Sequence, residues 1–202
     1  MPRKIIPLVT GQIYHIYNRG VDKRDIFQET GDYQRLYYSL IYFNTDQISQ
    51  NFRLAKSRYS KDSQRLVDVH AYSLLPNHFH LILTQLKDNG ISEYMKRVSA
   101  GYTGFFNEKY KRSGSLFQGT FKRIHVEDEE QYRYLFAYVN ENHYVHGISR
   151  QSGYVYSSSE HFQKINVSHL INIDMAEYHS SEAQKIAEDI YVKRKDFWEA
   201  LE

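Results

Sequence analysis

Two histidines separated by a single residue form the first pattern in the chain that could do chemistry. His78 and His80 open residues 78–85, a largely apolar segment that predicts a strand. Side chains two positions apart on a strand point to the same face, so both imidazoles would lie side by side while Phe79 points into the core. Imidazole binds Zn, Cu, Fe and Ni and tolerates Mn. Taken alone, the pattern favours two half-exposed strand histidines without a ligand, and a metal site needs a third ligand.

A second pattern offers both a ligand and a nucleophile. Tyr134, Tyr138 and Asn142 follow at intervals of four in a segment that predicts a helix, so they share one helical face. An asparagine oxygen can bind a cation, and a tyrosine hydroxyl can form a covalent intermediate. From the spacing alone, a packing tyrosine and an asparagine near the helix end are the simpler interpretation.

Basic residues gather in two places, although the net charge is only +2. Residues 91–125 contain seven Lys or Arg and two Glu, whereas residues 126–145 contain five acidic residues and one Arg. The basic stretch alternates with Phe and Tyr, which suits the phosphates and bases of single-stranded nucleic acid. A smaller cluster, Arg19, Lys23 and Arg24, follows the first predicted strand. Solvated loops and helix ends would have the same composition, so that alternative stays open.

The elements that must position these residues alternate along the chain. The hydrophobic patterns predict strands at residues 11–18, 66–75, 78–85 and 115–126, helices at 32–43, 91–110 and 127–142, and a polar connection at 51–65. The β-α-β-β-α-β order predicts an α+β fold, a ferredoxin-like antiparallel sheet with helices on one face. The helix that carries Tyr138 follows, and then a C-terminal helical tail with a helix near 181–197.

Length and composition exclude several classes of protein. The 202 residues suit one domain with an appendage. The chain has no cysteine, which excludes a disulfide scaffold, a cysteine-ligated zinc site and a cysteine nucleophile. It has no run of 18 apolar residues and no apolar leader near residue 1, so we expect a cytoplasmic protein without a membrane span.

Five segments taken in order carry a resemblance to a known family. They are YHIYNRGVDKRDIF (14–27), LPNHFHLIL (75–83), LFQGTFK (116–122), YVNENHYVHG (138–147) and YSS (156–158). This set resembles the IS200-like (Y1) single-tyrosine HUH transposases, and most closely the REP-associated tyrosine transposases. The likeness covers about residues 8–162, so we expect a transposase domain at 1–162 and a helical extension at 163–202.

The resemblance implies an active site. The family binds a divalent cation, Mg²⁺ or Mn²⁺, through the two histidines, here His78 and His80, and through a polar residue four positions after its nucleophilic tyrosine. That pattern corresponds to Tyr138 and Asn142. The family cuts single-stranded DNA beside hairpins through a 5′-phosphotyrosine intermediate and rejoins strands. It usually has Asn-Pro where this chain has Asn142-His143, which makes His143 a competing ligand.

Charge and motif position together predict the contacts with single-stranded or hairpin DNA. The expected residues are Arg19, Lys23, Arg24, Lys111, Arg112, Gln118, Lys122 and Arg123. The basic side chains would contact phosphates, and Gln118 a base or a sugar.

Two other functions are compatible with these residues. A domesticated relative would bind hairpin DNA without cleaving it. An unrelated histidine–metal hydrolase would act on a small molecule and would show no salt-sensitive binding of DNA. The sequence also leaves open whether the protein is a homodimer and whether Tyr138 serves its own subunit or a partner.

Overall fold

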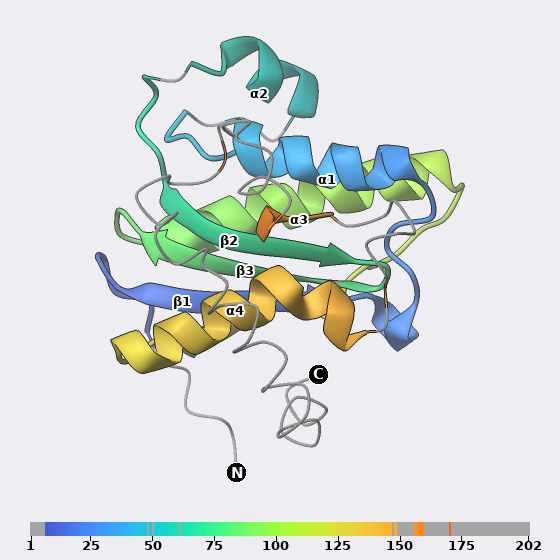
Figure 1. Cartoon of the computed structure of the whole chain (residues 1–202). Coiled ribbons are helices and arrows are strands. Elements are labelled where there is room, and N and C mark those ends of the chain that lie inside the picture. Colours follow the sequence, from blue (N-terminus) through green and yellow to red (C-terminus); the bar gives the residue numbers. More distant parts are fainter. Residues whose placement is uncertain are drawn as a thin grey trace.

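A five-stranded antiparallel sheet forms the centre of the structure, a computed structural model that describes residues 7–47, 49, 51–60, 62–146, 148, 156–159 and 170 (Figure 1). The strands lie in the order β4-β1-β3-β2-β5, so β1, β3 and β2 are each paired on both sides. Their bounds are β1 Ile13–Arg19, β2 Val67–Leu75, β3 His78–Gln85, β4 Lys122–His125 and β5 Tyr156–Ser157.

Helices cover both faces of the sheet. Two of them, α1 (Thr30–Tyr42) and α3 (Gly90–Lys109), lie together on one face, whereas α4 (Glu129–Val145) crosses the other (Figure 1). Apart from a 3-10 turn, η1 (Val21–Lys23), and one short additional helix, the elements from β1 to β4 follow the predicted β-α-β-β-α-β order. The α+β class and the antiparallel sheet are therefore confirmed.

Side-chain alternation along the strands divides the core in two. On β3, Leu81 and Leu83 are buried in the cluster that α1 and α3 cover. Ile82, between them, belongs to a separate cluster with Leu135 and Val139 of α4. Successive strand residues point to opposite faces, so every second residue of β3 faces α4.

One predicted strand is much shorter than expected. The alternating pattern at residues 115–126 predicts a long strand, but only β4 is regular. Before it, the chain turns at Gly119, whose φ of +77° lies in the region that glycine adopts without strain. Phe117 forms only an isolated bridge, to Gly20. The turn therefore takes the first half of the segment out of the ladder while keeping it beside the end of β1.

Other elements differ at their boundaries. The polar connection at 51–65 contains a short helix, α2 (Phe52–Arg58), because the Asn51 side chain accepts hydrogen bonds from the first turn. The helix predicted at 127–142 continues to Val145 as part of α4. The sequence did not predict β5, which is only two residues long.

The expected C-terminal extension at 163–202 lies outside the described residues except for Leu170, and the helix expected near 181–197 lies wholly outside them. Within the part of the chain that the structure describes, no helix is both long and apolar enough to cross a membrane.

A buried histidine fixes the start of α4 to the sheet. His70 lies at an irregularity in the pairing of β2 with β3. Its Nδ1 is 2.9 Å from the Tyr132 hydroxyl of α4, and its Nε2 is 2.7 Å from Thr84 Oγ1. Burial lowers the pKa of His70 to about 4, although nearby Asp68 acts in the opposite direction.

This pKa predicts a loss of stability in acid. Below about pH 6.5 the unfolded chain binds a proton at residue 70 that the folded chain does not bind until about pH 4. The stability supplied by neutral His70 is thus complete above the unfolded pKa and falls by up to about 3 kcal/mol as the pH drops to 4. Urea unfolding of wild type and His70→Gln between pH 7 and 4 should show a shallower fall for the variant. If the free energy of unfolding falls equally with pH in the two proteins, neutral His70 is not the source of the acid sensitivity.

Candidate active site

The two histidines of β3 lie on the face of the sheet that α4 covers. His78 and His80 alternate with Phe79, which is buried in the opposite core cluster as predicted. Both histidines are buried, and their ring centroids are 5.0 Å apart. The pairing of β1 with β3 places Tyr17 opposite His80 and Arg19 opposite His78. The strand register thus brings aromatic and basic side chains of β1 to the histidine pair.

Helix α4 brings Tyr138 to this pair. Leu135 and Val139 pack against the sheet and fix the rotation of the helix. The Tyr138 ring lies edge-on to two imidazoles, with its centroid 5.5 Å from that of His80 and 6.3 Å from that of His15. Tyr138 is only 1% exposed. The structure therefore brings together the tyrosine and the histidine that the sequence selected from segments 58 positions apart.

The last turns of α4 add polar groups. Asn142 is fully buried, and neither its Oδ1 nor its Nδ2 has a hydrogen-bond partner among the described residues. A buried amide without partners is costly, and an absent ion is one explanation for such a group. His143 is also buried, with Nε2 3.8 Å from Glu141 Oε2. The choice between Asn142 and His143 as a ligand stays a prediction.

Three residues near the histidine pair were not singled out in the sequence. His15 of β1 lies with Nε2 2.9 Å from His80 Nδ1, and Asn77 of the β2–β3 turn lies with Oδ1 2.6 Å from His78 Nδ1. His146, one turn after Asn142, has its ring centroid 4.8 Å from that of His78. The four-residue spacing from Asn142 could have indicated His146. His15 could not be found from spacing, because its position depends on which strands pair.

Two histidines on this face, His15 and His80, are neutral at pH 7. Burial lowers the pKa of His15 to about 3. Burial also lowers the pKa of His80 well below its ordinary value, and the other histidines and Arg19 act in the same direction. The rings of His15 and His80 therefore each carry one proton and one lone pair.

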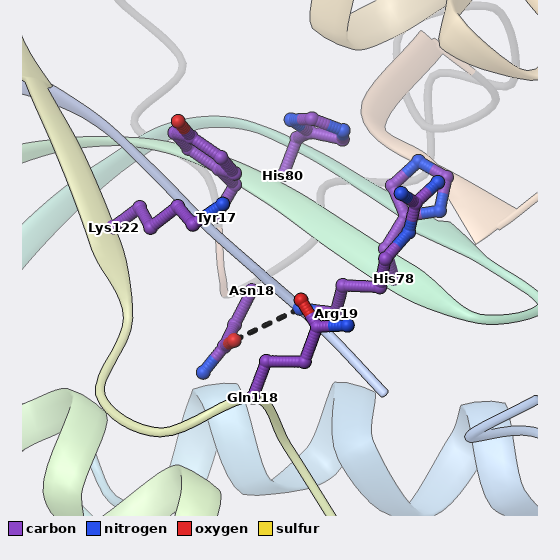
Figure 2. Close-up of a pocket in the computed structure, with 7 residues that line it drawn as sticks. All are labelled: Tyr17, Asn18, Arg19, His78, His80, Gln118 and Lys122. Atoms are coloured by element: carbon purple, nitrogen blue, oxygen red, sulfur yellow. Dashed lines mark hydrogen bonds between the residues drawn. The ribbon is translucent and has the colours of Figure 1, made fainter. Parts of the chain in front are cut away.

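A pocket opens beside the histidine pair (Figure 2). Its lining comes from β3, from the end of β1 and from the segment that leads into β4: Tyr17, Asn18, Arg19, His78, His80, Gln118 and Lys122. Lys122 Nζ lies 5.6 Å from the centre of the Tyr17 ring. Three of the eight predicted DNA contacts, Arg19, Gln118 and Lys122, thus lie in the same pocket as the predicted metal ligands.

The other predicted contacts have different surroundings. Lys23 and Arg24 are exposed in the loop after β1, and the Lys23 carbonyl accepts a hydrogen bond from Asn77 beside His78. Lys111 is exposed after α3. Arg112 is bound to Asn107 Oδ1 near the end of α3 at 2.6 Å and to Ser115 O of its own loop at 3.0 Å.

Arg123 lies on the opposite face of the sheet from Lys122. On β4, Lys122 pairs with Tyr17, whereas Arg123 pairs with Ile16, which is buried in the cluster of α1 and α3. Adjacent strand residues point to opposite faces. The two neighbouring basic residues therefore cannot contact the same stretch of DNA in the same way.

A short segment after α4 fixes the helix to the sheet. Ser158 Oγ donates to Asn140 Oδ1 of α4 and accepts from the Tyr72 amide of β2 at 3.0 Å. Asn140 Nδ2 in turn donates to Phe136 O at 2.8 Å. All these groups are buried. The YSS motif thus has a structural role, since it holds the part of α4 that lies between Tyr138 and Asn142.

Removal of this hydroxyl should destabilise the protein. In Ser158→Ala, the Asn140 oxygen and the Tyr72 amide lose a buried partner, which should lower the free energy of unfolding by about 1–3 kcal/mol. Urea unfolding measures the loss. Ser57→Ala, which removes an exposed hydroxyl from α2, should change stability by less than about 0.5 kcal/mol. Equal stability of the two variants would show that the bonds to Ser158 do not hold α4.

The chain has a solved structural counterpart. It is similar to a REP-associated tyrosine transposase bound to a REP hairpin, with a TM-score of 0.57 and 16% sequence identity, over 85% of this chain and 92% of that chain. No family model matches the chain, and no curated protein matches it. At this identity the likeness shows the fold, so the resemblance predicted from the motifs is confirmed at that level.

Proposed function

We propose that the protein is a metal-dependent single-stranded DNA transesterase that cuts beside DNA hairpins through Tyr138. The observation that carries this proposal is the edge-on contact between Tyr138 and His80 on the face that α4 covers. A nucleophilic side chain and a metal-binding side chain, selected separately from the sequence, lie against each other there. The similar fold of a transposase bound to a REP hairpin supports hairpin DNA as the substrate.

The residues at this site fit a divalent cation. His80 Nε2 and Asn142 Oδ1 are buried without a hydrogen-bond partner among the described residues. The part of the chain that the structure describes contains no group of three or more His, Cys, Asp or Glu that could hold a metal. The third ligand must then be of another type, and we assign the site to His78, His80 and the amide oxygen of Asn142. Two imidazoles favour Mn²⁺, whereas Mg²⁺ prefers oxygen ligands. The bound cation would polarise a phosphoryl oxygen and stabilise charge in the transition state.

The chain itself supplies the covalent step. The Tyr138 oxygen attacks phosphorus, a new O–P bond forms, and the bond from phosphorus to the 3′ oxygen breaks. The tyrosine proton is lost and the leaving oxygen gains one, so the products are a 5′-phosphotyrosine and a free 3′-hydroxyl. The phosphodiester energy is conserved in the tyrosine ester, so a second hydroxyl can rejoin the strand without ATP.

The pocket beside the histidines suits the DNA backbone. Arg19 and Lys122 provide cations for phosphates, and Tyr17 provides a ring face beside them. Lys23 and Arg24 extend the positive surface along the adjoining loop. Phosphate contacts of this kind hold a strand in place without reading its sequence.

A second candidate is a hairpin-binding protein that does not cleave. The low exposure of Tyr138, at 1%, favours it, because a buried hydroxyl reaches phosphorus only if the surrounding side chains move. The two candidates share the DNA surface and differ in whether an adduct forms.

Covalent capture distinguishes them. Labelled single-stranded hairpin DNA from the flanks of the gene, incubated with the protein and Mn²⁺ or Mg²⁺, should give a protein–DNA band on a denaturing gel. Tyr138→Phe should abolish the band, because phenylalanine has no hydroxyl, and EDTA should prevent it. Tyr134→Phe, one turn away on α4, is the matched control and should retain the band. Salt-sensitive binding without any adduct would support the second candidate instead.

Lys122 and Arg123 test the DNA surface with adjacent residues. Lys122→Gln should weaken binding of every single-stranded sequence, because one phosphate contact is lost. The slope of the logarithm of the binding constant against the logarithm of the salt concentration should become shallower by about 1. Arg123→Gln removes the same charge from the other face of the sheet and should have little effect. Filter binding at several salt concentrations measures both. An equal loss in the two variants would mean that general charge, rather than this pocket, attracts the DNA.

A further inference from the structure

Both histidines of the candidate metal site contact a neighbour through Nδ1. His78 Nδ1 lies 2.6 Å from Asn77 Oδ1, and His80 Nδ1 lies 2.9 Å from His15 Nε2. On a neutral imidazole, one nitrogen carries the proton and the other holds the lone pair. The partner of Nδ1 therefore determines whether Nε2 can bind a cation.

Asn77 fixes the tautomer of His78. Its Nδ2 donates to the Lys23 carbonyl at 3.2 Å, which orients the amide and leaves Oδ1 facing His78. An amide oxygen only accepts hydrogen bonds, so the proton lies on His78 Nδ1. In the neutral ring the lone pair is consequently on Nε2.

The hydrogen bond between His15 and His80 does not by itself fix the tautomer of either ring. The two facing nitrogens share one proton, which can belong to either ring. If His15 holds it, then His80 Nε2 carries a hydrogen that has no acceptor among the described residues. If His80 holds it on Nδ1, then its Nε2 keeps the lone pair and His15 accepts at Nε2. The proton of His15 then lies on its own Nδ1, which likewise has no acceptor among the described residues. A cation at Nε2 selects the second arrangement.

We propose that His15 and Asn77 are positioning residues, which accept the Nδ1 protons of His80 and His78 and thereby leave both Nε2 lone pairs available to a divalent cation. The inference rests on the proposed function, because it takes both histidines as ligands. His15 and Asn77 act through the hydrogen bond alone and do not themselves bind the cation. Hydrogen-bonded partners of metal-binding histidines typically contribute 10–100-fold in metal affinity or activity.

Mn²⁺ binding to the full chain, measured by titration calorimetry, tests this role without an activity assay. His15→Phe and Asn77→Leu remove the acceptors and should weaken Mn²⁺ binding about 10–100-fold. His15→Gln keeps an acceptor oxygen and should restore affinity to within a few-fold of wild type. His125→Phe, a histidine of β4 on the opposite face of the sheet, is the matched control and should bind as wild type does.

The outcomes separate this inference from the proposed function. If wild type binds Mn²⁺, His80→Ala does not, and His15→Phe binds as tightly as wild type, the inference for His15 is overturned and the metal site stands. If wild type binds no Mn²⁺, the metal site and the inference are both overturned. Equal loss in His15→Phe and His15→Gln would mean that the imidazole is needed for packing rather than as an acceptor, which also overturns it.

Tautomers can be observed directly, even where a variant folds poorly. Long-range ¹H–¹⁵N spectra of wild-type protein labelled with ¹⁵N-histidine should show the Nδ1–H form for His78 with and without Mg²⁺, and for His80 in its presence. A proton on Nε2 of His78 would overturn the role of Asn77. A proton on Nε2 of His80 with Mg²⁺ present would overturn the role of His15.

Discussion

The structure depends on the two-sided burial of β3. This strand is paired on both sides and covered by helices on both faces, so each of its residues has a fixed environment. Phe79, Leu81 and Leu83 fill the core beneath α1 and α3. The alternate positions place His78 and His80 beneath α4, next to Ile82, which packs on that helix. A shift of one residue in register would place two imidazoles in the apolar core beneath α1 and α3 and turn leucines toward α4, so packing also fixes which side chains face that helix.

The sequence predicted this strand well because its signal is local. The bounds of β3 agree with the prediction, and the helical spacing of Tyr138 and Asn142 placed both on α4. The strand predicted at 115–126 failed because alternation continues through Gly119, where the backbone turns. Alternation describes side-chain preference, whereas membership of a sheet requires a partner at every position.

The arrangement of the candidate site was predicted only in part, because some of its contacts depend on how distant segments pair. The histidine pair follows from strand period, but the contacts of His15 and Asn77 arise from strand pairing and turn geometry, which no spacing reveals. Arg112 and Arg123 have the charge expected for DNA contacts. Hydrogen bonds hold Arg112 to the end of α3 and to its own loop. Side-chain alternation along β4 places Arg123 on the far face of the sheet. Composition identifies basic residues, whereas the fold determines which of them share a surface.

The link between β4 and α4 limits what the tyrosine helix can reach. Strand β4 ends at His125 and α4 begins at Glu129, and the Val126 amide donates to Ile13 O at 3.0 Å, which pins the link to β1. At about 3.5 Å per residue, the four steps from His125 to Glu129 span at most about 14 Å. So short a tether keeps the first turn of α4 close to the edge strand β4, so the place where the helix crosses the sheet is set where the chain leaves the ladder.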